Sequence, residues 1–175
     1  MSLMKFLGFL WVIDSIIILD ACADCRQVVS RSKPGDYSVT SLKSAIIQSN
    51  TRPVVQRGGG AKTIQMVTPA CGATSLLSGF TTIPPNQGIP MHYHNCEETV
   101  LVVEGAAIVE TDEGAFTAMA GDVVWQAEGT PHRFVNASND HALKIYWTYA
   151  SSKATRTLVE RGETVSVFTE GHNSQ

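Results

Sequence analysis

A series of short runs rich in β-branched and aromatic residues occupies most of the chain after residue 60. Turn residues separate the runs, for example Pro-Pro-Asn at 84–86, Asp-Glu-Gly at 112–114 and Gly-Thr-Pro at 129–131. These residues set φ for a turn or tolerate a positive φ. Short strands at this spacing are typical of a sandwich or barrel, so we expect an all-β fold. The runs cover residues 62–67, 74–83, 99–103, 106–111, 115–119, 123–126, 133–136, 143–149 and 156–160.

The chain has 175 residues, which suits one domain with a substantial core better than two marginal ones. Three successive glycines at 58–60 interrupt the preceding segment, because glycine commits least to any regular element. We therefore expect residues 1–59 to form an N-terminal arm or a targeting segment, residues 60–160 the barrel and residues 161–175 a C-terminal tail. Within the arm, apolar residues at helical spacing predict one short helix at 41–48.

The start of the chain has two interpretations. Residues 6–19 are almost all apolar, Lys5 precedes them, and Ala-Cys-Ala at 21–23 has the small-x-small form of a secretory cleavage site. Asp14 interrupts the apolar run, which favours a strand or helix packed on the barrel or on a partner subunit. The packed arm predicts a cytoplasmic protein, whereas a signal peptide predicts an exported one. A membrane-spanning helix needs ~20 apolar residues, which is more than this run contains, so we expect no membrane partner.

Composition argues against several functional classes. The net charge is −3, and Lys and Arg form no cluster that would bind a phosphate backbone, so we expect no nucleic-acid partner. The cysteines are too few and too scattered for a disulfide framework in a chain of this length. Cys22-x-x-Cys25 has the spacing of a redox or zinc motif, but no second pair completes a tetrahedral zinc site. The cysteines are Cys22, Cys25, Cys71 and Cys96.

Histidines with strand spacing carry the chemical signal of the chain. His92 and His94 lie at i and i+2 of an extended segment, so both imidazoles project from the same face. Glu98 has the same parity and would add an oxygen ligand to a cation, although the adjacent Glu97 competes for that role. His132 follows a turn on a later strand and completes the set. The sequence therefore predicts one divalent metal held by these three histidines and Glu98.

Two motifs around these residues resemble those of the cupin superfamily. The segment from Gly88 through His92, His94 and Glu98 to Gly105 resembles the first motif, G-x5-H-x-H-x3-4-E-x6-G. The segment 121–136, with His132 inside it, resembles the second motif, G-x5-P-x-G-x2-H-x3-N. Three residues instead of five separate Gly88 from His92, and Ala127 stands where the second motif usually has proline. Both departures affect turns and not the expected ligands. The resemblance covers roughly residues 60–150.

The resemblance implies a double-stranded β-helix, the jelly-roll or cupin barrel, with a metal near its middle. By similarity, His92, His94, Glu98 and His132 are the ligands, the same set that the spacing predicts. Three nitrogens and one oxygen suit iron, manganese, nickel, cobalt or zinc, and the sequence does not choose among them. Related cupins commonly form homodimers, so we also expect a homodimer.

These expectations favour a small metalloenzyme that acts on a small organic substrate, with a dioxygenase-like oxidoreductase first. An isomerase or lyase on the same metal is one alternative, and a non-catalytic module binding a sugar-like or metal-chelating ligand is another. Tyr146 shares a face with polar neighbours and is the residue we expect to act as an acid or hydrogen-bond donor. Side chains expected to line the pocket are Met91, Tyr93, Trp125, Phe134 and Tyr146.

Overall fold

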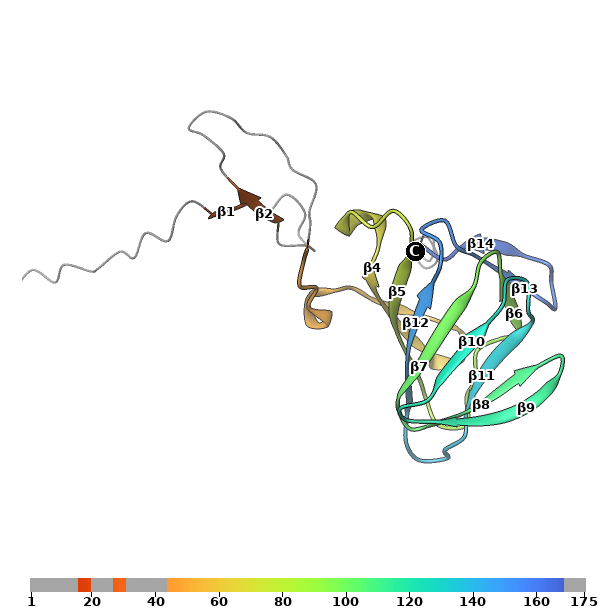
Figure 1. Ribbon diagram of the computed structural model, residues 1–175. Coiled ribbons are helices and arrows are strands. Elements are labelled where there is room, and N and C mark those ends of the chain that lie inside the picture. The colour runs from red at the N-terminus through yellow and green to blue at the C-terminus, as the bar shows by residue number, and fades with distance from the viewer. Residues whose placement is uncertain (1–15, 20–26, 31–43, 169–175) are drawn as a thin grey trace, which may run out of the picture. The chain divides into compact units, whose positions relative to one another are not determined.

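A computed structural model describes residues 16–19, 27–30 and 44–168 of the chain (Figure 1). The chain divides into two compact units, Met1–Ile46 and Ile47–Gln175. In the first unit, β1 (Ile16–Leu19) and β2 (Gln27–Ser30) form an antiparallel pair. The predicted helix at 41–48 is wrong over residues 44–48, which form no helix, while 41–43 lie outside the described residues. The cleavage-site prediction at 21–23 and the Cys22-x-x-Cys25 motif also lie outside them.

The second unit contains two six-stranded antiparallel sheets, which Figure 1 shows as facing layers. In the first sheet the strands follow the order β10-β7-β12-β5-β4-β3. They are β3 (Val54–Gln56), β4 (Lys62–Val67), β5 (Leu77–Ile83), β7 (Glu98–Glu104), β10 (Val123–Gln126) and β12 (Leu143–Tyr149). In the second sheet the order is β14-β13-β6-β11-β8-β9. The strands of this second sheet are β6 (His92–His94), β8 (Ala106–Thr111), β9 (Gly114–Met119), β11 (His132–Asn136), β13 (Thr155–Leu158) and β14 (Thr164–Ser166).

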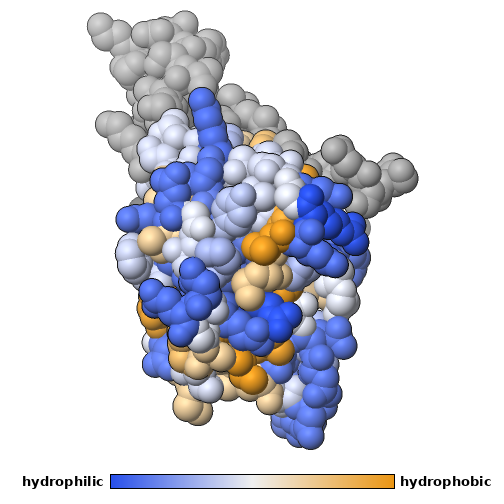
Figure 2. Space-filling model, turned by 90° about the vertical axis from the view of Figure 1, so that its right-hand side faces the viewer, coloured by the Kyte–Doolittle hydropathy of each residue, from blue (hydrophilic) through white to orange (hydrophobic). Residues whose placement is uncertain are grey.

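This arrangement confirms the predicted all-β jelly-roll barrel. Single-turn 3₁₀ helices connect some strands: η1 (Ser49–Thr51), η2 (Gly58–Gly60) and η3 (Pro69–Cys71). Of the residues described, none belongs to a helix long and apolar enough to cross a membrane. Figure 2 shows one face, on which small hydrophobic patches are surrounded by hydrophilic side chains, as is usual for a water-exposed surface.

The barrel extends beyond the predicted boundaries at both ends. Strand β3 pairs with β4 before residue 60, and β14 pairs with β13 after residue 160. The three glycines form the turn between β3 and β4, with positive φ at Gly59 and Gly60, so they do not separate an arm from the barrel. A glycine tolerates this conformation without the steric cost that a Cβ would add. The N-terminal side of the sheet therefore begins with β3.

Strand alternation determines which side chains face the barrel interior. In β12, Leu143, Ile145, Trp147 and Tyr149 are buried, and the intervening residues are only partly buried. The indole N–H of Trp147 donates to Thr81 Oγ1 at 3.0 Å. Gly79 lies against the same indole, and an added Cβ would lie 2.5 Å from Trp147 Cζ2. The other inward-facing apolar residues come from both sheets, including Val100, Val102, Val109 and Phe134.

Candidate metal centre

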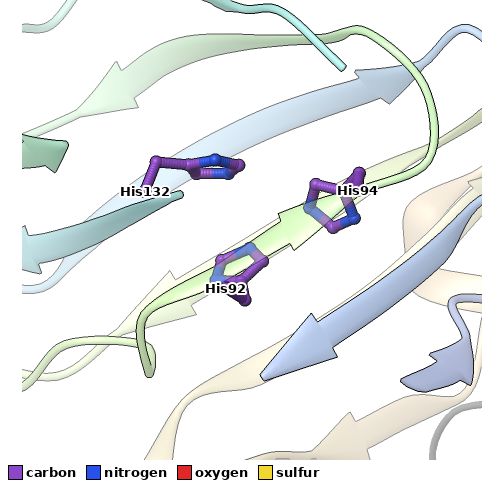
Figure 3. Close-up of side chains that lie close together, drawn as sticks. All are labelled: His92, His94 and His132. Atoms are coloured by element: carbon purple, nitrogen blue, oxygen red, sulfur yellow. The ribbon is translucent and has the colours of Figure 1, made fainter. Parts of the chain in front are cut away.

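Two adjacent strands of the second sheet position the three histidines. His92 and His94 are the ends of β6, so strand alternation puts both side chains on one face. His132 begins β11 and lies directly opposite His92 in the antiparallel register. The imidazoles lie close together in the barrel interior (Figure 3), with one ligand nitrogen from each ring within 4.8 Å of the others. All three side chains are buried.

Backbone carbonyls fix the tautomer of each imidazole. The Nδ1–H of His92 donates to Pro90 O at 2.7 Å, that of His94 to Thr155 O at 2.8 Å, and that of His132 to Thr130 O at 2.8 Å. A carbonyl oxygen can only accept, so the proton of a neutral ring resides on Nδ1. The Nε2 lone pair is then available to a cation, as in histidine metal ligands whose second nitrogen is held by a carbonyl.

Glu98 reaches the cluster from the other sheet. It begins β7, four residues after His94, and the turn between them carries the chain from one layer to the other. Its Oε2 lies 3.0 Å from His132 Nε2 and 3.6 Å from His94 Nε2. The carboxylate is buried, so its charge needs a neighbouring positive group. Glu98 thus lies beside the histidines, although it arrives by a turn and not on the same strand, and its role as a metal ligand stays a prediction.

The electrostatics of the cluster suit a cation. Burial lowers the pKa of His92 far below its usual value, and positive charge on His132 and His94 would lower it further. Burial also lowers the pKa of His94, against the opposing charge of Glu98. Burial alone would lower the pKa of His132, but its hydrogen bond and charge interaction with Glu98 raise it. A cluster that holds at least two neutral imidazoles beside one carboxylate has the donors that a divalent transition metal requires.

An unsatisfied atom supports this fit. Within the part of the chain that the structure describes, His94 Nε2 is buried and has no hydrogen-bond partner. An orphaned buried nitrogen costs free energy unless another group binds it. A metal ion at the centre of the cluster would use this lone pair together with those of His92 and His132.

A cavity of about 260 Å³ opens beside the cluster. His92 and Glu98 lie in its wall, and Phe134, Ile145 and Trp147 supply an apolar surface. Tyr149 lies directly opposite Glu98 in the register of β12 and β7. Burial, followed by the charge of Glu98 and a hydrogen bond to it, raises the pKa of Tyr149 well above its usual value. Tyr149 therefore stays protonated and can donate a hydrogen bond at neutral pH.

The pocket predictions from sequence are only partly confirmed. Phe134 lines the cavity, but Trp125 is 59% exposed, and Met91, Tyr93 and Tyr146 are absent from its wall. Tyr146 alternates with the inward-facing residues of β12, and its hydroxyl donates a hydrogen bond to Ser78 Oγ at 2.8 Å. Its position gives no contact with the cavity, and Tyr149 is the tyrosine that lies beside Glu98.

The sequence did not predict that several other side chains lie in this region. Arg57 and Arg156 line the cavity, although they are about 100 positions apart in the printed sequence. Gln126 is buried opposite Glu98, and its Nε2 has no hydrogen-bond partner among the described residues. Strand pairing brings these residues together, and a single sequence carries no direct signal for such pairing. His141, by contrast, is exposed.

A jelly-roll barrel with a buried three-histidine group that could hold a metal ion defines a cupin-type protein. Comparison with known families agrees: residues 79–149 match the family model described as "Cupin domain". The matched residues include His92, His94, Glu98 and His132, and they overlap the two segments whose motifs resemble those of cupins.

Individual relatives are distant. Protein SchB of Streptomyces halstedii is 28% identical over 109 residues, which cover 62% of this chain and 79% of SchB. Among solved structures, the polyketide cyclase RemF from Streptomyces resistomycificus is similar with a TM-score of 0.54 and 19% identity, covering 72% of this chain and 87% of RemF. A sugar phosphate isomerase of the cupin superfamily from Silicibacter pomeroyi has a TM-score of 0.51 and 22% identity, covering 64% and 73%. These structural similarities establish the fold.

Proposed function

We propose that this chain is a metal-dependent enzyme that acts on a small organic substrate bound in the cavity beside His92. The observation that carries the proposal is the convergence of three buried imidazoles on one point next to a buried carboxylate and an open cavity. A purely structural histidine cluster would satisfy its nitrogens internally, whereas His94 Nε2 remains without a partner in the described part of the chain.

We propose His92, His94, Glu98 and His132 as the residues that hold one divalent ion. The set of three nitrogens and one oxygen fits iron, manganese, nickel, cobalt or zinc. The chemistry that such an ion supplies when bound is polarisation of a substrate oxygen and, for a redox-active ion, activation of dioxygen. Glu98 would offset part of the positive charge, and the carbonyls of Pro90, Thr155 and Thr130 would orient the ligands.

Other residues of the chain would bind and orient the substrate. Phe134, Ile145 and Trp147 exclude water from one side of the cavity and contact an apolar part of the substrate. Tyr149 would hold a proton beside Glu98 and donate it, or a hydrogen bond, to a substrate oxygen. We assign to Tyr149 the role that the sequence analysis gave to Tyr146.

Two reaction classes fit this arrangement. Oxidation by dioxygen remains the first to test, because the donor set suits a redox-active ion. Isomerisation or a lyase reaction is favoured by one specific observation, the pairing of a protonated Tyr149 with Glu98, which provides a proton donor and a carboxylate side by side. The similar solved structures are named for different reactions, so their similarity supports small-molecule chemistry without selecting a reaction.

Elemental analysis of protein purified without a metal-affinity step tests the proposal. We expect about one transition-metal ion per chain in the wild type and in His141→Ala, which removes an exposed histidine. We expect His94→Ala to lose the ion while keeping its β-sheet spectrum. Turnover or oxygen consumption that depends on the ion would then separate an enzyme from a non-catalytic binding module. Wild-type protein that takes up no transition metal under any loading condition would contradict the proposal.

A further inference from the structure

We infer, on the basis of the proposed function, that the substrate is a planar ring compound with an oxygen atom at each end, and that Thr63 and Thr81 bind the oxygen remote from the metal centre. The proposed function locates the reacting end of the substrate beside His92 and Glu98. The two threonines add a second binding point in the wall of the same cavity. They take a carbonyl or hydroxyl oxygen, because their hydrogen bonds leave one O–H donor unused.

Strand register places the two threonines next to each other inside the barrel. Thr63 of β4 lies directly opposite Thr81 of β5 in the antiparallel pairing of these strands. Residues opposite each other in such a pair project from the same face of the sheet. Both side chains are buried, both line the cavity, and their hydroxyl oxygens are 3.0 Å apart. The pair is therefore a polar point on an interior wall.

The hydrogen bonds of the threonine pair leave one donor unused. The indole N–H of Trp147, which can only donate, bonds to Thr81 Oγ1 at 3.0 Å. One threonine hydroxyl donates to the other, and each hydroxyl carries a single hydrogen. If Thr63 donates, the hydrogen of Thr81 is unused, and if Thr81 donates, the hydrogen of Thr63 is unused. Within the part of the chain that the structure describes, these are the hydrogen bonds of the two hydroxyls, so one O–H is left for a ligand in both arrangements.

A hydrogen-bond acceptor in the cavity would stabilise this buried O–H group. A buried polar group without a partner costs free energy, and a ligand oxygen placed there would accept the bond. The pair also keeps a free lone pair in both arrangements, because a hydroxyl oxygen can accept two hydrogen bonds. A substrate carbonyl would accept from the pair, and a substrate hydroxyl would accept and donate. A methyl or an ammonium group would leave the threonine hydrogen without an acceptor.

The threonine pair lies apart from the metal centre along β12. Thr81 lies opposite Ile145 of this strand. Tyr149, four positions later, lies opposite Glu98. Four residues of a strand span about 13 Å, so a single substrate oxygen does not reach both points. The oxygen at the threonines is therefore a second one, remote from the reacting end of the substrate.

The wall between these two points is aromatic. On the inward face of β12, Trp147 comes between Ile145 and Tyr149. It lies opposite Gly79 of β5, and because Gly79 has no side chain, the indole extends over β5 to Thr81. A planar ring between the metal centre and the threonines would contact this indole, and aromatic rings pack favourably in offset or edge-to-face geometry. A planar ring compound with an oxygen at each end thus fits this wall.

Two ligands of matched shape test the threonine site. The first is a naphthalenediol whose hydroxyl groups lie at opposite ends of its fused rings, and the second is the naphthol in which a methyl group replaces one hydroxyl. Calorimetric titration of the full-length protein gives the ratio of their affinities, with zinc as the loaded ion because zinc is not redox-active. We expect the wild type to bind the diol about tenfold or more tightly than the naphthol.

Threonine variants assign this preference to the two hydroxyls. Thr63→Val with Thr81→Val should bring the two affinities within about threefold of each other, because neither ligand then finds a donor at that end. Each single Val variant keeps one hydroxyl and should still prefer the diol, and Thr63→Ser with Thr81→Ser should keep the wild-type ratio. Thr82→Val is the matched control, because Thr82 is the next residue of β5, alternates with the inward-facing residues and does not line the cavity. Its ratio should equal that of the wild type.

The outcomes for the threonine site and for the metal centre are separable. A wild type that binds both ligands equally would overturn the inference even if the double Val variant did not fold, and so would a tenfold preference that persists in the folded double Val variant. Either result in protein that holds metal would leave the metal proposal standing. Metal content should be the same in the wild type and in all threonine variants. If no sample takes up metal, the proposed function fails, but the same titrations of metal-free wild type and double Val variant still decide the role of the threonines.

Discussion

Replacing Asn136 by alanine should destabilise the barrel, because one buried backbone carbonyl would lose its hydrogen-bond donor. Asn136 ends β11, the strand that begins with His132, and its Nδ2 donates to Ile83 O at 3.0 Å and to His141 O at 2.8 Å. Its Oδ1 accepts from the backbone N–H of Ser138 at 2.9 Å. Ile83 has no exposed surface, so water cannot replace the lost donor to its carbonyl.

The magnitude follows from these three hydrogen bonds. An unpaired buried carbonyl costs about 1–3 kcal/mol, and the two bonds nearer to solvent add about 0.5 kcal/mol each. We therefore expect Asn136→Ala to lower the free energy of unfolding by about 2–4 kcal/mol. Because Asn136 holds the end of the strand that carries His132, the variant should also bind metal less tightly than the wild type.

Urea unfolding followed by tryptophan fluorescence measures the change, provided that the m-value stays constant. Ser138→Ala is the control, because its hydroxyl bonds to Asp140 and to neighbouring N–H groups at the exposed surface. We expect the control to cost less than about 1 kcal/mol. An Asn136→Ala barrel within about 0.5 kcal/mol of the wild type, or a control that costs as much as the variant, would refute the reasoning.

Three further predictions concern the core, the metal and the assembly. Gly79→Ala should lower the free energy of unfolding by about 1–3 kcal/mol, because the added Cβ would overlap Trp147. The control Gly58→Ala should be near neutral, because nothing lies within 4 Å of its added Cβ. Thermal melts of both variants measure the difference. Adding the ion at 100 times its Kd should stabilise the wild type by about 2.7 kcal/mol but leave His94→Ala unchanged, and equal shifts in both would contradict the proposed ligands. We keep the homodimer as a proposal, in which a second copy covers the edge strand β10, where Val123 is 64% and Trp125 59% exposed. Light scattering should then find a dimer in the wild type and a monomer in Val123→Lys with Trp125→Lys, and a monomeric wild type would end this proposal.

Local periodicity made the histidine cluster predictable. His92 and His94 share a face because alternation along a strand has a period of two, which requires no knowledge of the fold. His132 and Asn136 could be placed from the spacing of the second cupin motif. The all-β class followed from the regular turns, and the structure has strands at or near the predicted runs.

Predictions that required the identity of neighbouring strands did worse. Tyr146 and its polar neighbours were expected to face the pocket, whereas the opposite face of β12, with Trp147 and Tyr149, lines it. One strand cannot reveal which of its faces meets the interior when the interior is itself a cavity with polar residues. Arg57 follows β3 of the first sheet and Arg156 lies on β13 of the second, and a single sequence does not show that both line one cavity.

The pairing of β13 with β6 connects the proposed metal centre with the cavity wall. The carbonyl of Thr155 accepts a hydrogen bond from the Nδ1–H of His94 at 2.8 Å. The next residue, Arg156, lies opposite His94 and lines the cavity. One short strand thus orients a proposed metal ligand through its backbone and contributes a side chain to the cavity wall one position later. A change of side chain at Arg156 leaves the Thr155 carbonyl in place, so it should spare metal content. A change that displaces the backbone of β13 should reduce metal content, because His94 would lose the carbonyl that orients its imidazole.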